Sequence, residues 1–222
     1  LDSLVPRKEP VSLYEPIKYV LSGGGKRIRP ILTLFTCEAL GAAPEPAFDA
    51  AIAIEVLHNF TLVHDDIMDN ADTRRGRMTV HKKWDRDAAI LSGDQLVGIA
   101  YNKLLKANSH RIREIMEVFT NGILEVCEGQ GLDKEFELRK EVSIDDYLIM
   151  IEKKTSKLLE TCTVIGALIA DARNEEINAV RNYAINLGLA FQIQDDLLDI
   201  FADEKKFGKK SGGDISEGKK TY

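Results

Sequence analysis

One stretch decides the fold class: residues 50–69, which read AAIAIEVLHNFTLVHDDIMD. Apolar residues such as Ala50 and Ile54 recur there at helical spacing, so the stretch predicts a long helix. Near its C-terminal end, Asp65 and Asp69 stand four residues apart and therefore project from one face of that helix. The stretch predicts an apolar helix that ends in a pair of carboxylates.

Residues beyond this stretch follow the same helical pattern. All six prolines fall within the first 46 of the 222 residues, as expected when long helices with short connections make up the rest. Strand-like alternation is hard to find, and the predicted fold class is all-α. Several segments are apolar on more than one face, which favours a helical bundle around a central apolar cavity. The predicted helices cover residues 12–21, 30–41, 46–69, 87–106, 110–131, 144–170 and 175–201.

Composition excludes several classes of protein. The chain has 30 basic and 36 acidic residues, and this balance argues against a nucleic-acid binder, which would carry a broad basic face. No stretch reaches the roughly 18 uninterrupted apolar residues of an integral membrane segment, and the N-terminus lacks a signal-peptide pattern. Cys37, Cys127 and Cys162 lie far apart in apolar surroundings, which predicts buried, reduced thiols and a cytoplasmic protein.

The aspartate pattern occurs twice. Residues 192–199 (QIQDDLLD) echo residues 62–69 (LVHDDIMD), so Asp195 and Asp199 also share a helix face. Like charges at this spacing repel one another and face the negative end of the helix dipole, so we expect a cation to neutralise them. Carboxylates without histidine or cysteine partners suit a hard ion, and Mg²⁺ fits best where substrate phosphates complete its shell. The two segments predict metal sites for a phosphate-bearing ligand.

Basic residues accompany both aspartate segments. Residues 23–30 (GGGKRIRP) form a flexible loop in which glycines allow close backbone approach to an anion, while Lys26 and Arg29 supply charge. Their spacing is not that of a nucleotide-binding P-loop. Arg74 and Arg75 follow the first aspartate segment, and adjacent arginines there can contact phosphate oxygens bidentately. Further cations next to the acidic segments are Lys154, Lys209 and Lys219.

Together these motifs resemble one family. They occur in the order GGGKRIRP (23–30), DDIMD (65–69) with RRG (74–76), Gly93-Asp94, Lys154-Thr155 and FQIQDDLLD (191–199). The chain resembles the trans-isoprenyl diphosphate synthases, the polyprenyl synthetase family, over nearly its whole length. The resemblance implies a single polyprenyl synthetase domain, residues 1–222, with an isoprenoid-synthase-type bundle. Family members usually continue for several more helices, so we expect C-terminal helices to be missing here.

The resemblance also implies a reaction. Isopentenyl diphosphate condenses head-to-tail with an allylic diphosphate, which ionises to an allylic cation and releases diphosphate. The implied cofactor is Mg²⁺, three ions per site, with Mn²⁺ as an alternative; it would stabilise the leaving group as its charge develops. Apolar helix walls would keep water from the cation. The family further implies a homodimer.

By motif position, the resemblance assigns roles to individual residues. Metal ions would be ligated by Asp65, Asp69 and Asp195, supported directly or through water by Asp66, Asp196 and Asp199. The allylic diphosphate would be held by Arg74, Lys154, Lys209, Thr155 and Gln192. Isopentenyl diphosphate would be held by Gly25, Lys26, Arg29, His58 and Arg75, and Lys219 would help to close the site. The product-length floor would be formed by Phe60 and Thr61. Such a floor favours a twenty-carbon product, then a fifteen-carbon one, with longer polyprenyl products left open.

Three other interpretations compete. A di-iron bundle is indicated by the Glu-x-x-His spacing of Glu55 and His58, but such sites need a second copy and no other histidine supplies one. A terpene cyclase would share the first aspartate motif, yet it needs no second diphosphate site. A non-catalytic subunit of a heteromeric synthase would tend to lose an aspartate motif, whereas this chain keeps both.

Overall fold

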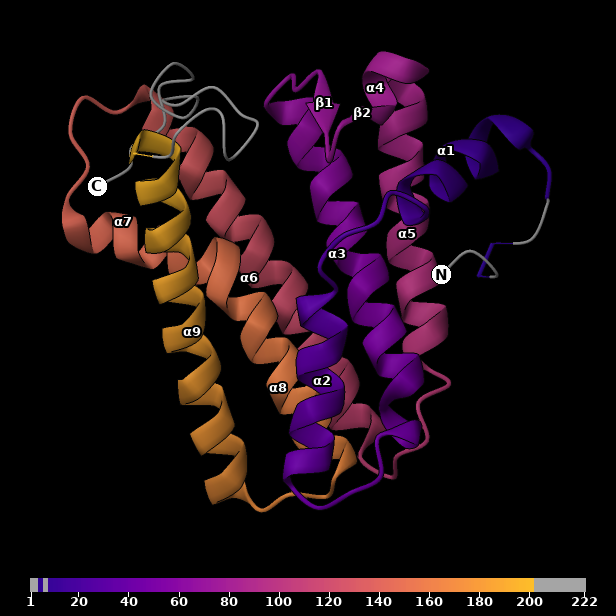
Figure 1. The fold of residues 1–222 in the computed structure, drawn as a ribbon, viewed down its shortest axis with the longest axis vertical. Helices are drawn as coiled ribbons and strands as arrows, with labels where there is room; N and C mark the ends of the chain where they lie inside the picture. The colour runs from indigo at the N-terminus through magenta and orange to yellow at the C-terminus, as the bar shows by residue number, and fades with distance from the viewer. Residues whose placement is uncertain (1–3, 6–7, 202–222) are drawn as a thin grey trace. The chain divides into compact units, whose positions relative to one another are not determined.

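The computed structural model describes residues 4–5 and 8–201 (Figure 1). The chain divides into two compact units. The first comprises residues 1–35 and 43–112, and the second comprises residues 36–42 and 113–222. Helix α2 (Ile28–Ala39) begins in the first unit and ends in the second. The single domain expected from the sequence stays a prediction.

Three helices dominate the first unit: α1 (Val11–Leu21), α3 (Phe48–Met68) and α5 (Arg86–Leu104). Two short segments accompany them, η1 (Glu45–Ala47) directly before α3 and α4 (Val80–Lys83) before α5. Helix α3 packs along α5, and α1 contacts both (Figure 1). The first aspartate segment therefore stands at the end of a helix that is supported along its length.

Small residues bring α3 and α5 close together. The ring of His64 on α3 lies directly against Gly93 of α5, where an added Cβ would collide with the ring. The start of α5 is fixed by Asp85, whose carboxylate accepts a hydrogen bond from the backbone N–H of Ala88 at 2.7 Å. The glycine at position 93 therefore allows α3 and α5 to pack closely, and the Asp85 cap fixes where α5 begins.

A two-stranded antiparallel hairpin follows the first aspartate segment. Strands β1 (Thr73–Arg74) and β2 (Arg77–Met78) pair with Arg74 opposite Arg77. The loop between them is Arg75-Gly76, with φ angles of 54° and 73°. Two consecutive positive φ angles are typical of the tight hairpin loops that match the twist of the strands. The glycine satisfies this requirement at no steric cost, and the arginine is held in a less favourable conformation.

The second unit consists of α6 (Ile112–Leu138), α7 (Ile144–Ile151), η2 (Glu152–Ser156), α8 (Lys157–Ile169) and α9 (Asn174–Phe201). Segments α7, η2 and α8 form one continuous helical run, in which η2 is a π-helical turn. Helix α9 packs along α8 and contacts η2 and α7. The second aspartate segment lies near the end of α9.

The start of α7 is fixed by a capping box. Ser143 accepts a hydrogen bond from the N–H of Asp146 at 3.1 Å, and the Asp146 carboxylate accepts one from the N–H of Ser143 at 3.3 Å. Beyond the cap, the buried side chains of Phe136, Tyr147 and Ile151 belong to one apolar cluster. This cluster anchors α7 against the end of α6 and positions Tyr147.

The all-α prediction is confirmed, and each predicted helix corresponds to a helix or helical run of the structure. Helix α6 reaches residue 138 rather than 131, because Leu132 and Phe136 continue its apolar pattern. The predicted helix 144–170 is correct in extent but contains the π turn. Sequence reasoning missed the hairpin and α4, whose strands and single turn are too short to produce a periodic signal.

Two further expectations concern thiols and membrane spans. Cys37 and Cys162 are buried, but Cys127 is exposed, so the prediction of three buried thiols is wrong there. Within residues 4–5 and 8–201, one segment, Glu45–Met68, is long and apolar enough to cross a membrane by length and composition alone. Of its most apolar window, 56% is buried inside the structure, and the core helix of a folded domain passes the same test.

Candidate active-site residues

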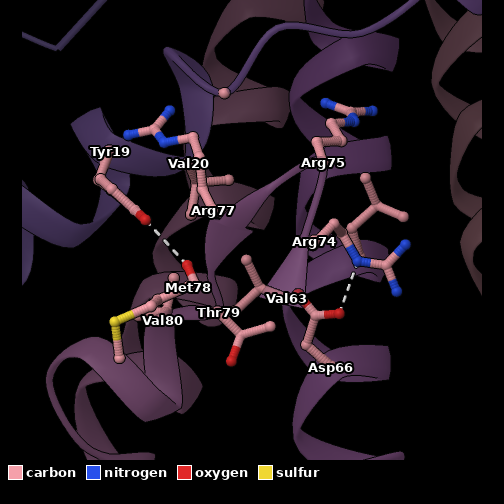
Figure 2. Close-up of a pocket in the computed structure, with 12 residues that line it drawn as sticks. Tyr19, Val20, Val63, Asp66, Arg74, Arg75, Arg77, Met78, Thr79 and Val80 are labelled. Atoms are coloured by element: carbon pink, nitrogen blue, oxygen red, sulfur yellow. Dashed lines mark hydrogen bonds and ion pairs between the residues drawn. The ribbon is translucent and has the colours of Figure 1, made fainter. Parts of the chain in front are cut away.

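The first aspartate segment occupies the end of α3. Asp66 is its buried member, 5% exposed, and its Oδ1 accepts a hydrogen bond from Arg74 Nε at 2.5 Å (Figure 2). Burial raises the pKa of Asp66 above its ordinary value, and the Arg74 guanidinium opposes that shift. Asp65 and Asp69 keep part of their surface exposed. The outer carboxylates can therefore reach a ligand, while the middle one holds the hairpin arginine.

A cavity of about 50 Å³ lies beside the Asp66–Arg74 pair (Figure 2). At its rim, the Arg77 guanidinium stands 3.8 Å from the centre of the Tyr19 ring, and the Tyr19 hydroxyl donates to the carbonyl of Met78 at 2.9 Å. These contacts tie the hairpin to α1 and so help to fix Arg74. A space of this size holds water-sized molecules.

The glycine-rich loop delivers two arginines to α3. Arg27 adopts a φ of 54° and pairs with Glu55, which is 3% exposed. Arg29 Nη1 lies 3.2 Å from His58 Nε2, one turn further along α3. Glu55 and His58, the residues of the Glu-x-x-His spacing, are therefore engaged by arginines, which counts against the di-iron interpretation.

The same loop meets the hairpin. Arg75 donates a hydrogen bond to the carbonyl of Gly24. At Gly25, which has a φ of 130°, an added Cβ would stand 2.8 Å from the guanidinium carbon of Arg75. Glycine is required here both by its backbone angle and by the arginine that lies against it.

Positive charge gathers around His58 as a result. Burial lowers its pKa well below the ordinary value, and the positive charges of Arg29, Arg75, Arg74 and Arg27 lower it further. His58 is therefore neutral at physiological pH, and its Nε2 can accept from Arg29. Several guanidinium groups around a neutral imidazole form a region suited to a multiply charged anion.

Three more predicted residues lie in the first unit. Lys26 is exposed within the glycine-rich loop. Phe60 and Thr61 stand about one turn before the aspartates on α3. The Phe60 ring meets His64 edge-to-face at 4.8 Å, and the Thr61 hydroxyl donates to the carbonyl of His58 at 2.9 Å. Their role in product length stays a prediction.

In the second unit, Asp196 is the buried member of its aspartate segment. It is 5% exposed, and its two oxygens accept hydrogen bonds from the Tyr147 hydroxyl at 2.6 Å and from Gln192 Nε2 at 2.8 Å. The Gln192 carbonyl oxygen in turn accepts from Thr155 at 2.7 Å. Burial, and then the hydrogen bond to Asp196, raise the pKa of Tyr147, so its hydroxyl remains a donor at neutral pH.

The predicted lysines have different outcomes. Lys154 lies in η2, and its Nζ donates to Asp133 on α6 at 2.6 Å. Lys154 thus lies in the same unit as Thr155 and Gln192, and its role at the allylic diphosphate stays a prediction. Lys209 and Lys219 lie outside the described residues.

Both aspartate segments share one arrangement. In each, the middle aspartate is buried and bonded to protein groups, while the outer ones, Asp65 with Asp69 and Asp195 with Asp199, are at least partly exposed. Within the part of the chain that the structure describes, no group of three or more such side chains is already gathered around a metal position. A donor set of carboxylates alone nevertheless fits a hard divalent cation that takes its remaining oxygens from water or phosphate.

Sequence reasoning missed four residues that support these groups: Asp133, Tyr147, Arg27 and, as a partner of the loop, Glu55. Asp133 did leave a signal, because it falls on the buried stripe of α6 formed by Val126, Gly129, Gln130 and Phe136. A carboxylate on such a stripe needs a partner. Arg27 had no comparable signal, because its pairing depends on a positive φ.

Comparison with known proteins places the chain. The sequence model described as polyprenyl synthetase matches residues 10–222. The chain belongs to the polyprenyl synthetase family. It is 44% identical over 223 residues to a geranylgeranyl diphosphate synthase of Methanosarcina mazei, covering 100% of this chain and 69% of that protein. It is 47% identical to a short chain isoprenyl diphosphate synthase of Methanocaldococcus jannaschii, covering 94% of this chain and 64% of that protein.

Solved structures in the family agree. A crystal structure of geranylgeranyl pyrophosphate synthetase from Pyrococcus horikoshii matches with a TM-score of 0.95 at 44% identity, covering 99% of this chain and 68% of that one. The all-α fold expected from the resemblance is therefore the fold of the family. The chain spans about two thirds of the length of the relatives that it matches.

Proposed function

We propose that the protein is a Mg²⁺-dependent prenyltransferase that condenses isopentenyl diphosphate with an allylic diphosphate. The observation that carries this proposal is the repeated aspartate arrangement: a buried middle carboxylate bonded to the protein, and outer carboxylates accessible to a ligand. Two such segments, accompanied by arginines and Lys154, suit substrates that each carry a diphosphate. Membership of the polyprenyl synthetase family supports the same activity.

The chain's own residues have distinct tasks in this reaction. Asp65, Asp69 and Asp195 would hold Mg²⁺, which when bound stabilises negative charge on the departing diphosphate. Lys154 would contact the allylic diphosphate and favour its departure. Arg29 and Arg75, in the positive region around His58, would bind the diphosphate of isopentenyl diphosphate. The positive charge around His58 supports the assignment of Arg29 and Arg75, and the motif position of Lys154 supports its assignment.

The bonds change in a fixed order. The allylic carbon–oxygen bond breaks, and diphosphate leaves with the electron pair. The double bond of isopentenyl diphosphate then supplies two electrons for the new carbon–carbon bond. A proton leaves the condensed cation for the departed diphosphate, which restores a double bond and gives a product five carbons longer. Apolar helix residues protect the cation from water.

We assign a twenty-carbon product, on the position of Phe60 and on the names of the relatives. A bulky aromatic about one turn before the aspartates would limit the length of the growing chain. The first relative is named a geranylgeranyl diphosphate synthase, and its 44% identity covers this whole chain. A homodimer is proposed from the family alone.

Asparagine substitution of an outer aspartate tests the proposed function. Asp65→Asn removes the charge that would bind the metal and also relieves repulsion from Asp69, so activity should fall by at least about 10²-fold while stability is kept or slightly raised. The matched control is Asp145→Asn, an exposed residue of α7. Full elongation activity in Asp65→Asn would contradict the assignment of this carboxylate to the metal.

A further inference from the structure

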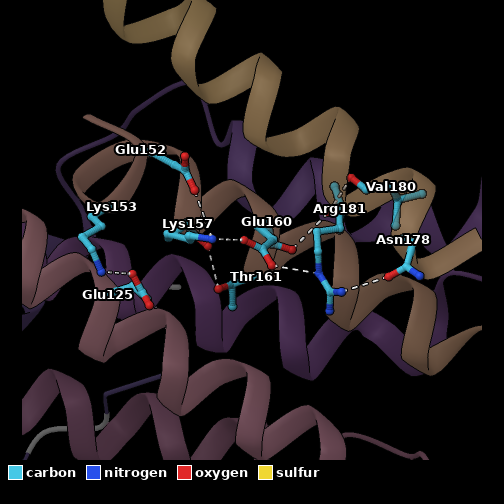
Figure 3. Close-up of polar contacts among 10 residues, drawn as sticks. Glu125, Glu152, Lys153, Lys157, Glu160, Thr161, Asn178, Val180 and Arg181 are labelled. Carbon is cyan, nitrogen blue, oxygen red and sulfur yellow. Dashed lines mark hydrogen bonds and ion pairs between the residues drawn. The ribbon is translucent and has the colours of Figure 1, made fainter. Parts of the chain in front are cut away.

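The π turn η2 departs from regular helix where the second unit places its functional side chains. Three consecutive residues of the turn reach two different helices. Lys153 binds Glu125 of α6 at 2.6 Å (Figure 3) and Glu128 of the same helix at 2.7 Å. Lys154 binds Asp133 of α6, and Thr155 binds Gln192 of α9. Single π turns within α-helices are uncommon, and those that occur are often found at functional sites.

Two glycines, one on α6 and one on α9, lie against this turn. At Gly129 of α6, an added Cβ would stand 2.7 Å from the Cα of Lys154 and closer still to its backbone nitrogen. At Gly188 of α9, an added Cβ would stand 2.5 Å from the Cα of Ser156. Because the obstacles at both positions include main-chain atoms, a side chain at either position cannot be accommodated by a rotamer change alone. The backbone of the turn would have to move.

Backbone contact, rather than polar bonding, holds the far end of the turn. The Ser156 hydroxyl is fully buried and has no hydrogen-bond partner in the described structure, which is an unfavourable arrangement. Close packing against Gly188 holds Ser156 in this position. By contrast, an added Cβ at Gly131, two residues from Gly129 on α6, would meet nothing within 4 Å.

A displacement of the turn would affect the second aspartate segment. A side chain at Gly129 would displace the Lys154 backbone by on the order of 1 Å before ordinary contact is restored. That shift would change the approach of Lys154 to Asp133, and it would pull on the Thr155–Gln192–Asp196 chain of hydrogen bonds. Both the cation and the buried aspartate depend on how closely the turn is seated.

We propose that Gly129 and Gly188 are positioning residues, a glycine clamp that seats the π turn so that Lys154 and Asp196 are correctly placed for the allylic diphosphate. The inference rests on the proposed function. Neither glycine would touch substrate; each would act through the backbone of residues 154–156. The residues proposed for isopentenyl diphosphate, including Arg29 and Arg75, belong to the first unit, whereas both glycines belong to the second.

Alanine substitution at two glycines of the same helix tests the clamp. Gly129→Ala and Gly131→Ala gain the same helix propensity, so any difference between them reports the contact with the turn. In the full-length protein, kcat/KM for the allylic diphosphate should fall about 10²-fold in Gly129→Ala and less than about twofold in Gly131→Ala. The KM for isopentenyl diphosphate should be unchanged in both, a split that general destabilisation would not produce.

Amide hydrogen exchange of residues 152–156 provides a measurement that does not depend on activity. Exchange should be at least about tenfold faster in Gly129→Ala than in Gly131→Ala, because the turn is no longer seated. Equal exchange and equal allylic kinetics in the two variants would overturn the clamp. If the wild-type protein shows no elongation, the proposed function fails, and the exchange comparison alone decides whether the clamp exists.

A second variant covers a failure to fold. Gly188→Ala approaches the same turn from α9 and should give the same selective loss for the allylic diphosphate. If Gly129→Ala and Gly188→Ala both fail to fold while Gly131→Ala folds, the positioning role is overturned, because the two glycines are then required for folding itself.

Discussion

Removing the hydroxyl of Tyr147 tests how the second aspartate segment is supported. Tyr147 is 2% exposed, and its hydroxyl donates to Asp196 at 2.6 Å. The substitution Tyr147→Phe keeps the ring in its cluster with Phe136 and Ile151 and removes only the donor. One oxygen of a buried carboxylate then loses its partner, while the hydrogen bond from Gln192 to the other oxygen remains.

The size of the effect follows from that geometry. A hydrogen bond to a charged group is worth about 1.5–3 kcal/mol, and a buried carboxylate oxygen left without a donor keeps its desolvation cost, so we expect a loss of about 2 kcal/mol. For a chain of this size, that corresponds to a fall in Tm of about 4–8 °C. Because Asp196 lies beside Asp195, the concentration of Mg²⁺ needed for half-maximal activity should rise about tenfold.

Urea unfolding and a Mg²⁺ titration of elongation measure the two effects. The control is Tyr183→Phe on α9, whose side chain is 61% exposed and which should change the free energy of unfolding by less than about 0.5 kcal/mol. If Tyr147→Phe is as stable as Tyr183→Phe and requires no more Mg²⁺, the hydrogen bond to Asp196 does not support the site.

Three other perturbations have defined outcomes. Phe60→Ala should lengthen the product, and an unchanged product distribution by chromatography would remove Phe60 from the limit on chain length. Arg27→Ala leaves the buried carboxylate of Glu55 without its guanidinium and should cost about 3 kcal/mol in urea unfolding, against less than about 0.5 kcal/mol for Arg113→Ala, whose side chain is 92% exposed. The pKa of His58 in the folded chain is well below 6.5, so on acidification the unfolded chain gains a proton that the folded chain does not. The contribution of His58 to the free energy of unfolding is therefore fully present above about pH 6.5 and falls as the pH drops below that value. His58→Gln should flatten that fall, whose slope is at most about 1.4 kcal/mol per pH unit. Equal slopes for the two proteins would contradict a neutral His58 in the folded chain.

Periodicity was sufficient for the long helices. The aspartate segments also followed from sequence, since two carboxylates four residues apart at an apolar helix end require a neutralising partner. The sequence did not predict which aspartate of each segment is buried and which ones are accessible to a ligand. Asp66 and Asp196 are buried, and the outer aspartates of each segment are at least partly exposed. The buried carboxylates have partners because Arg74 returns through a hairpin and Tyr147 comes from another helix.

Local departures from regular backbone were equally invisible. The π turn at Glu152–Ser156 depends on two glycines, 23 residues before Glu152 and 32 residues after Ser156 along the chain, at positions 129 and 188. Its residues have side chains with ordinary helix propensity, so propensity does not distinguish a π turn from a regular α-helix here. The Arg75-Gly76 loop is similar. Arg75 has a positive φ, and an arginine in a sequence does not predict that conformation.

Metal-dependent chain elongation can be tested in a single incubation. The full-length protein is given labelled isopentenyl diphosphate with a fifteen-carbon allylic diphosphate, in Mg²⁺ and in excess chelator, and the products are separated by chain length. We expect a labelled twenty-carbon diphosphate with Mg²⁺ and none with chelator. Absence of any elongated product in Mg²⁺, with five-, ten- and fifteen-carbon primers alike, would contradict it.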